Sequence, residues 1–323
     1  AIVTCTELKG LPLCARTSIA DSLNEAKTSL AFPFQLLVSL NACLGKPGGD
    51  TRTICKTPML YRMLLRADTS VREWETRTQR PYDKASAKSS ALLASLARNF
   101  LAEIAVWTGE CAAAVFNDFE KFFDTIDIRI LLEQAILNDF PLDQLVYALQ
   151  QHLAPRVIQV NGFSSEFIAV FRSILAGCKH SVALTKVYLR RTIDEVDQEY
   201  PDANTELFVD DTVMSATKTT ICDTINAIVP AILLFAKRVK IKLKLSLSPK
   251  AVITTSAPRM TKFLANEFKG HGLTFQTAKS ARDLGISYTA CTLRPKTQLL
   301  TRLRKKHRIK RISTLAKNSR KAR

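Results

Sequence analysis

The sequence predicts an α+β fold, because helical and strand patterns alternate along its 323 residues and no internal repeat is present. Apolar residues recur at helical spacing over residues 89–107, behind a serine that suits a helix cap. The run CAAAVFN (111–117) is typical of a buried strand. Residues 156–170 carry Asn161-Gly162 between alternating apolar residues, which predicts a hairpin.

The remaining elements follow from the same patterns and from turn and cap residues. Pro47-Gly48-Gly49 is expected to join two strands within residues 44–55. A pair of adjacent aspartates interrupts the β-forming stretch TELFVDDTVMSAT (205–217), which predicts a second hairpin. The other predicted elements are helices at 128–138 (capped by Asp127), 142–151 (started by Pro141), 181–199 and 219–240, and strands at 251–255 and 284–289.

The charge of the chain points to nucleic acid as a partner. The formal net charge is +18, and residues 302–323 contain 11 basic and no acidic side chains. The rest of the chain still carries 36 basic against 29 acidic side chains. Such a surface binds phosphates with release of counterions. The basic end has a second interpretation as a solvated or disordered tail, including a nuclear-import signal.

Cysteine usage and hydropathy restrict the class of protein. The eight cysteines include no C-x-x-C pair and form no cluster with the four histidines, so we expect reduced intracellular thiols without zinc or disulfides. The longest apolar run, residues 225–236, is about a dozen residues long and contains Pro230, so no membrane-spanning segment is predicted. The chain begins with Ala and has no secretory signal, and we expect a fragment of a longer protein.

Three carboxylates are the candidates for chemistry. Asp210 and Asp211 lie side by side at the predicted hairpin tip, and like charges this close require water or a cation between them. Asp118 follows the predicted buried strand, although alone it fits a surface turn equally well. Together they would suit two Mg²⁺ ions, which at a separation of about 3.5–4 Å activate the attacking oxygen and stabilise the leaving one in phosphoryl transfer.

Several blocks resemble the reverse transcriptases, especially those of non-LTR (LINE-type) retroelements and group II introns. DFEKFFDTI (118–126) and FVDD (208–211) resemble the family's motifs A and C. The further resemblances, in the family's order, are KPGGDTRTICKTP (46–58) to the fingers segment, VNGFSSEF (160–167) to the hairpin before motif B, AGCKHSVAL (176–184) to motif B, LKLSLSPKAVI (243–253) to motif D and ARDLGISYT (281–289) to motif E.

The resemblance implies roles for individual residues. It makes Asp118 and Asp210 ligands of two Mg²⁺ ions, for which Mn²⁺ is a possible substitute, with the Phe119 carbonyl as a further ligand and Asp211 assisting. It assigns the triphosphate of the nucleotide to Lys46 and Arg52, although a basic turn beside Gly-Gly is often only solvated. Lys250 in motif D would be an acid near the leaving pyrophosphate; the alternative is a surface lysine.

The resemblance also bears on substrate choice. It places Phe123 against the 2′ position of the nucleotide sugar, where a ribose hydroxyl would clash, and this favours deoxynucleotides. The alternative is a core aromatic packed with the neighbouring phenylalanines. In the pocket-forming motif B, Gly177 and Ser181 remain, but Ala176 replaces the usual glutamine and Val182 the usual proline; Thr53 also replaces a common proline in the fingers.

We therefore expect a right-hand polymerase fold that copies an RNA template into DNA, from a DNA or RNA primer and dNTPs. The alternatives are a catalytically decayed nucleic-acid-binding domain and an RNA-dependent RNA polymerase. A retroelement origin and the basic end favour a nuclear, non-membrane location. The expected parts are an N-terminal extension (1–29), fingers (30–110), a first palm segment (111–126), helices and a hairpin between fingers and palm (127–175), the palm (176–289) and a basic partial thumb (290–323).

Overall fold

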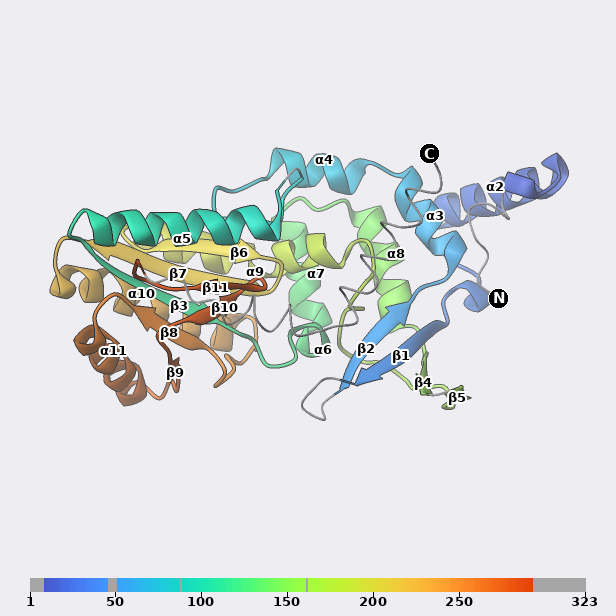
Figure 1. Ribbon diagram of the computed structural model, residues 1–323. Coiled ribbons are helices and arrows are strands. Elements are labelled where there is room, and N and C mark those ends of the chain that lie inside the picture. The colour runs from blue at the N-terminus through green and yellow to red at the C-terminus, as the bar shows by residue number, and fades with distance from the viewer. Residues whose placement is uncertain (1–8, 46–50, 88, 161, 293–323) are drawn as a thin grey trace, which may run out of the picture. The chain divides into compact units, whose positions relative to one another are not determined.

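The computed structural model describes residues 9–45, 51–87, 89–160 and 162–292, and the chain divides into two compact units (Figure 1). Each unit contains helices and a sheet, which confirms the predicted α+β class. The first unit comprises Ala1–Arg80, Phe119–Asp194 and Lys237–Ser246; the second comprises Pro81–Asp118, Glu195–Ala236 and Leu247–Arg323.

The first unit contains a sheet in the order β2-β1-β4-β5 and several helices. Aromatic and aliphatic side chains form its core, including the buried rings of Tyr61 and Tyr147, which both pack against Phe32. The elements are α2 (Leu13–Ser29), a 3₁₀ turn (Phe34–Leu36), β1 (Ser39–Gly45), β2 (Thr51–Lys56), α3 (Met59–Ala67), α4 (Ser70–Arg77), α6 (Phe122–Thr125), α7 (Ile128–Leu137), α8 (Leu142–Leu153), β4 (Arg156–Val160) and β5 (Phe163–Ser164).

The second unit is built on a sheet in the order β6-β7-β3-β8-β9, antiparallel except for the β8–β9 pair. Its elements are α5 (Ala91–Trp107), β3 (Cys111–Asn117), β6 (Asn204–Phe208), β7 (Asp211–Lys218), β8 (Val252–Thr255), α11 (Pro258–Gly270), β9 (Gln276–Thr277), β10 (Ala281–Asp283) and β11 (Ile286–Tyr288). Two long helices, α9 (Ser181–Glu199) and α10 (Ile221–Lys242), each begin in one unit and end in the other.

Most predicted elements are present within two residues of their expected ends. The predicted strand at 284–289 is present as β11, but it begins only at Ile286, because Leu284 and Gly285 both have positive φ and make the two-residue turn of a hairpin whose first strand, β10, was not predicted. In the predicted hairpin at 156–170 the first strand is β4, but the second strand, β5, is only two residues long. Beyond β5 the two segments pair once more, where Arg156 and Ile168 exchange backbone hydrogen bonds of 3.0 and 2.9 Å.

Pro230 lies inside α10, as the predicted helix at 219–240 implies. Among the described residues, no helix is both long and apolar enough to cross a membrane. The predicted Pro-Gly-Gly turn and the basic end lie outside the described residues.

Helix α5 packs on the sheet of the second unit with its small side chains. Ser90 caps the helix by accepting a hydrogen bond from the Leu93 N–H, as its sequence predicts. The buried positions of the helix are Ala94, Ser95, Arg98, Ala102 and Ala105, which recur at intervals of about one turn. Small side chains allow the helix to approach the alanine-rich strand β3 closely, and most of its large apolar residues are left in solvent.

Candidate catalytic site

The register of the central sheet brings Asp118 opposite Asp211. Strands β3 and β7 are antiparallel and their last pair is Asn117 with Thr212, so Asp118 and Asp211 are the next residues of the two segments at that end of the ladder. Residues directly opposite in such a ladder have Cα atoms about 4.5–5.5 Å apart. Two carboxylates from segments almost one hundred residues apart therefore share one end of the sheet.

Asp210 lies in the turn of the β6–β7 hairpin. Phe208 pairs with Asp211, so Val209 and Asp210 form a two-residue turn. Val209 has a φ of 61° and Asp210 does not have a positive φ, which is the pattern of a type II′ turn. The first position of that turn normally requires glycine, and a β-branched residue there is strained. The hairpin tip predicted from the sequence is confirmed, and its strained residue lies next to the aspartate pair.

The like charges at this end of the sheet change the acidity of Asp211. Removal from water, followed by the negative charges of Asp210 and Asp118, raises the pKa of Asp211 to about 6. Asp283 adds to the increase, and Arg98 opposes it. The side chain of Asp211 is exposed, so we attribute more of the shift to the neighbouring carboxylates than to burial. A bound cation would relieve this repulsion.

Among the described residues, no three Asp, Glu, His or Cys side chains converge closely enough to hold a metal ion in their present orientations. The backbone of the three aspartates nevertheless brings them to one end of one sheet, and carboxylate oxygen is the ligand that Mg²⁺ prefers. The residues therefore fit such an ion after side-chain rotation. The ligand set itself stays a prediction.

The motif D segment lies beside Asp118 in the same unit. The Ser248 N–H donates to the Asp118 carbonyl at 2.7 Å, and the Lys250 N–H donates to Ser248 Oγ at 3.2 Å. The Lys250 side chain is exposed. The loop that carries the predicted acid is thus tied to the backbone of the first aspartate.

The other predicted site residues belong to the first unit. Gly177 has a φ of 101°, a backbone conformation that favours glycine, and an added Cβ would be in ordinary contact with the Cys55 carbonyl at 3.6 Å. The Ser181 hydroxyl is buried and donates to the Leu175 carbonyl at 2.6 Å, at the start of α9. These two contacts give Gly177 and Ser181 structural reasons to be present, and their roles toward nucleotide stay predictions.

Phe119 precedes the short helix α6, and Phe123 lies within it. Phe119 is buried, and Phe123 is half-buried with its ring edge-on to Phe122 at 5.5 Å between centroids. The Phe123 carbonyl accepts a hydrogen bond of 2.9 Å from the Ile174 N–H, which fixes its backbone. Arg52 belongs to strand β2, but its side chain and the whole of Lys46 lie outside the described part of the chain.

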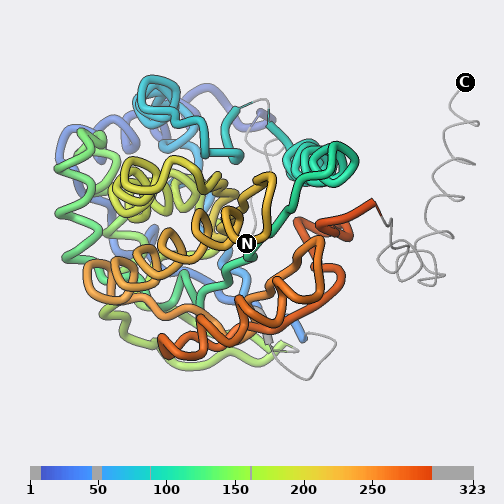
Figure 2. Tube along the Cα trace, turned by 90° about the vertical axis from the view of Figure 1, so that its left-hand side faces the viewer, coloured from blue at the N-terminus to red at the C-terminus, as the bar shows by residue number. Residues whose placement is uncertain are grey.

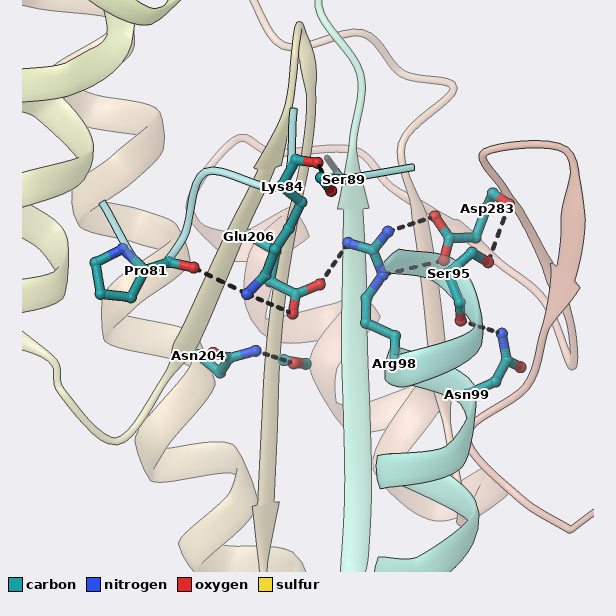
Figure 3. Close-up of polar contacts among 10 residues, drawn as sticks. Pro81, Lys84, Ser89, Ser95, Arg98, Asn99, Asn204, Glu206 and Asp283 are labelled. Atoms are coloured by element: carbon teal, nitrogen blue, oxygen red, sulfur yellow. Dashed lines mark hydrogen bonds and ion pairs between the residues drawn. The ribbon is translucent and has the colours of Figure 1, made fainter. Parts of the chain in front are cut away.

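A buried ionic cluster in the second unit was missed by sequence reasoning (Figure 3). Arg98 of α5 forms a bidentate pair with Asp283 of β10, at 3.0 and 2.9 Å, and a third bond of 2.7 Å with Glu206 of β6. Lys84 approaches the other oxygen of Glu206 at 3.7 Å. The available signal was Arg98 itself, the single basic residue of a largely apolar helix.

This cluster connects chain segments that are distant in sequence. The exposed fractions of Arg98, Glu206 and Asp283 are 4%, 5% and 2%, so one positive and two negative charges are withdrawn from water, and Lys84 brings a second positive charge to Glu206. Glu206 lies four residues before Asp210, on the strand that leads into the turn. The Ser95 hydroxyl donates to the Asp283 carbonyl at 3.2 Å and adds a second link from α5 to the β10–β11 hairpin (Figure 3).

The charge at Asp211 predicts a pH dependence of stability without metal. Because the pKa of Asp211 is higher in the folded state, protonation of this side chain stabilises the folded state. The stabilisation is fully present below about pH 3.8 and is lost as the pH rises through about 6. We therefore expect Asp211→Asn to be more stable than the wild type at pH 7, and the difference to vanish toward pH 4. Urea unfolding across this pH range measures it. A difference that is constant with pH would contradict the shifted pKa.

The chain is similar in sequence to a known protein family and in fold to a solved structure. The family model for reverse transcriptase (RNA-dependent DNA polymerase) matches residues 44–285, well over half of the chain. No curated protein matches the sequence. Among solved structures, the apo telomerase of Candida tropicalis truncated from the C-terminal domain is similar with a TM-score of 0.52 and 11% identity.

The similarity to that telomerase structure covers 84% of this chain and 58% of the telomerase chain, so the present chain spans little more than half of it. At this identity it shows the fold alone, and it supports the predicted right-hand polymerase fold. The family match covers both segments that carry the three aspartates. The chain belongs to the reverse transcriptase (RNA-dependent DNA polymerase) family.

Proposed function

We propose that this chain catalyses RNA-templated DNA synthesis, in which a primer 3′-hydroxyl attacks the α-phosphate of a dNTP and pyrophosphate leaves. The observation that carries the proposal is the sheet register that sets Asp118 opposite Asp211, with Asp210 in the adjoining turn. The family match supports polymerisation on an RNA template. The net charge of +18 supports binding of template and primer.

Two Mg²⁺ ions, or Mn²⁺ in their place, would be held by Asp118 and Asp210, with Asp211 and the Phe119 carbonyl assisting. When bound, such ions activate the attacking hydroxyl and stabilise the leaving oxygen. The raised pKa of Asp211 supports this assignment, because a site built from like charges gains most from a cation. Lys250 would donate a proton to the leaving pyrophosphate from the loop tied to Asp118.

We assign the selection of dNTPs over ribonucleotides to Phe123. Lys46 and Arg52 would hold the triphosphate of the nucleotide. Gly177 and Ser181 would line the nucleotide pocket. We expect Phe123→Ala to raise the efficiency of ribonucleotide incorporation relative to dNTP incorporation by about tenfold or more, because a smaller side chain removes the clash with the 2′-hydroxyl. Single-nucleotide insertion with each dNTP and its matching rNTP measures this ratio. Phe122→Leu, at a buried ring that is not assigned to the sugar, is the control. An unchanged ratio in Phe123→Ala would contradict the assignment.

Primer extension on a defined RNA template with Mg²⁺ or Mn²⁺ tests the proposal as a whole. Extension with dNTPs supports a reverse transcriptase in spite of Ala176 and Val182, whereas extension with rNTPs alone would indicate an RNA polymerase. A folded preparation that binds RNA and extends nothing would indicate a decayed domain. A retroelement origin and a nuclear location are part of the proposal and rest on the motif resemblance and on a basic end outside the described residues.

A further inference from the structure

Helix α5 exposes a broad apolar surface to solvent. Six of its large side chains, called here the α5 outer face, point away from the sheet: Leu92, Leu93, Phe100, Leu101, Ile104 and Trp107. Their exposed fractions lie between 50% and 82%. A set of this size along a helix of about 25 Å is far more than scattered exposed residues, and it indicates that another segment or protein covers it.

The charges on α5 restrict what covers this face. The helix contains two charged residues, Arg98 and Glu103, and Arg98 is turned inward to Glu206 and Asp283. The outer face therefore presents no positive charge. A basic segment with apolar side chains would meet no repulsion there.

The described chain ends close to α5. The Thr289 N–H donates to Asn99 Oδ1 at 3.4 Å, in the middle of the helix, and the described residues end three positions later at Thr292. Figure 2, in which α5 is seen nearly end-on, shows the red end of the described trace beside the helix. The next six residues reach about 20 Å when extended, and either end of α5 lies about 12 Å from its middle. Residues 293–323 are therefore within reach of the whole outer face.

Those remaining residues have a composition that fits the face. Residues 293–323 contain no acidic side chain, and after Leu293 their leucine and isoleucine residues fall in two groups separated by basic ones. The intervals within the groups are mostly three or four residues, which places apolar side chains on one side of a helical segment. The groups are Leu299, Leu300 and Leu303, followed by Ile309, Ile312 and Leu315.

We propose that the basic segment 293–323 of this same chain covers the α5 outer face, with Leu299, Leu300 and Leu303 as its first contacts. The helix and the last described residues before the segment belong to the same compact unit. Docking through leucine side chains would bury both apolar sets and leave the lysines and arginines in solvent, where nucleic-acid phosphates can reach them. The proposal does not depend on catalysis.

Trp107 provides a direct test. It is 82% exposed, whereas Trp74, the other tryptophan, is 2% exposed, so acrylamide quenching of the chain reports mainly on Trp107. We expect quenching in the full chain to be weak, and to increase severalfold in the triple variant Leu299→Ser, Leu300→Ser, Leu303→Ser. The matched control replaces Arg302, Arg304 and Lys305 by serine and should leave quenching unchanged. Trp107→Phe assigns the signal.

Three outcomes would overturn the proposal. Equal quenching in the full chain and the leucine variant would show that these leucines do not cover Trp107. If the basic-residue control loses as much protection from quenching as the leucine variant, charge rather than apolar contact is responsible. If Trp107 is protected in both the wild type and the leucine variant and this protection disappears on dilution, a second copy of the chain covers the face. Circular dichroism checks that each variant is folded.

A second variant tests the helix side of the contact. Ile104 is 58% exposed, so Ile104→Asp leaves the packing of α5 on the sheet intact. We expect it to release the segment and to accelerate tryptic cleavage within residues 302–311. An unchanged cleavage rate would contradict docking on this face.

Discussion

Asp210→Asn is expected to reduce primer extension by about 10³-fold or more, a loss of roughly 4 kcal/mol in transition-state stabilisation. The amide keeps the size of the side chain but removes the charge that the proposed metal ions require. Asp210 lies in the two-residue turn of the hairpin, which fixes its backbone beside Asp211. Steady-state extension on an RNA template, with saturating Mg²⁺, measures the loss.

Asp202→Asn is the matched control for this experiment. Asp202 precedes the same hairpin, is exposed, and pairs only at the surface with Lys218, so its neutral form should retain full activity. If Asp210→Asn keeps more than a tenth of wild-type activity while remaining folded, Asp210 does not hold the reacting metal. Equal losses in both variants would indicate a general effect on the hairpin and would also exclude that role.

Arg98→Met is expected to lower the free energy of unfolding of the second unit by about 3–5 kcal/mol. The substitution leaves the carboxylates of Glu206 and Asp283 buried without their main partner, and an uncompensated buried charge is far more costly than the loss of an exposed ion pair. Urea unfolding followed by circular dichroism measures the change. Arg80→Met, which breaks the partly exposed pair with Asp194, should cost less than about 1 kcal/mol.

A charge-neutral variant separates the ionic contribution from packing. Replacing Arg98 by Met, Glu206 by Gln and Asp283 by Asn together removes every charge of the triad, and we expect it to recover more than half of the stability lost by Arg98→Met. If the triple variant is as unstable as the single one, the cluster stabilises the unit by shape and hydrogen bonding rather than by charge balance.

Local patterns in the sequence were sufficient for most elements and for the motifs. The helix at 181–199 and the strand at 111–117 have the predicted bounds, because apolar periodicity and caps act within a few residues. The position of Asp118 directly after a strand and of Asp210 in a hairpin turn follows from the same local rules. The family resemblance added the chemistry that these patterns alone left open.

Other features depend on pairings between distant residues. Hydrophobic spacing in α5 predicted a helix but not which of its faces is buried. The small side chains of the helix face β3 because the helix lies close to the sheet, and that distance is not recorded in the helix sequence. The hairpin at β10 and β11 depends on two positive φ values that the sequence marks only by Gly285. Neither follows from a pattern of short range.

The sequence by itself determined which residues carry the carboxylates, the basic charge and the motifs of the reverse transcriptase family, since these are properties of short segments. The tertiary structure alone decided that Asp118 faces Asp211, that Arg98 is neutralised by Glu206 and Asp283, and that the large apolar face of α5 is left in solvent. The physical reason is that strand register and burial are set by contacts between residues up to 190 positions apart, which no local pattern records.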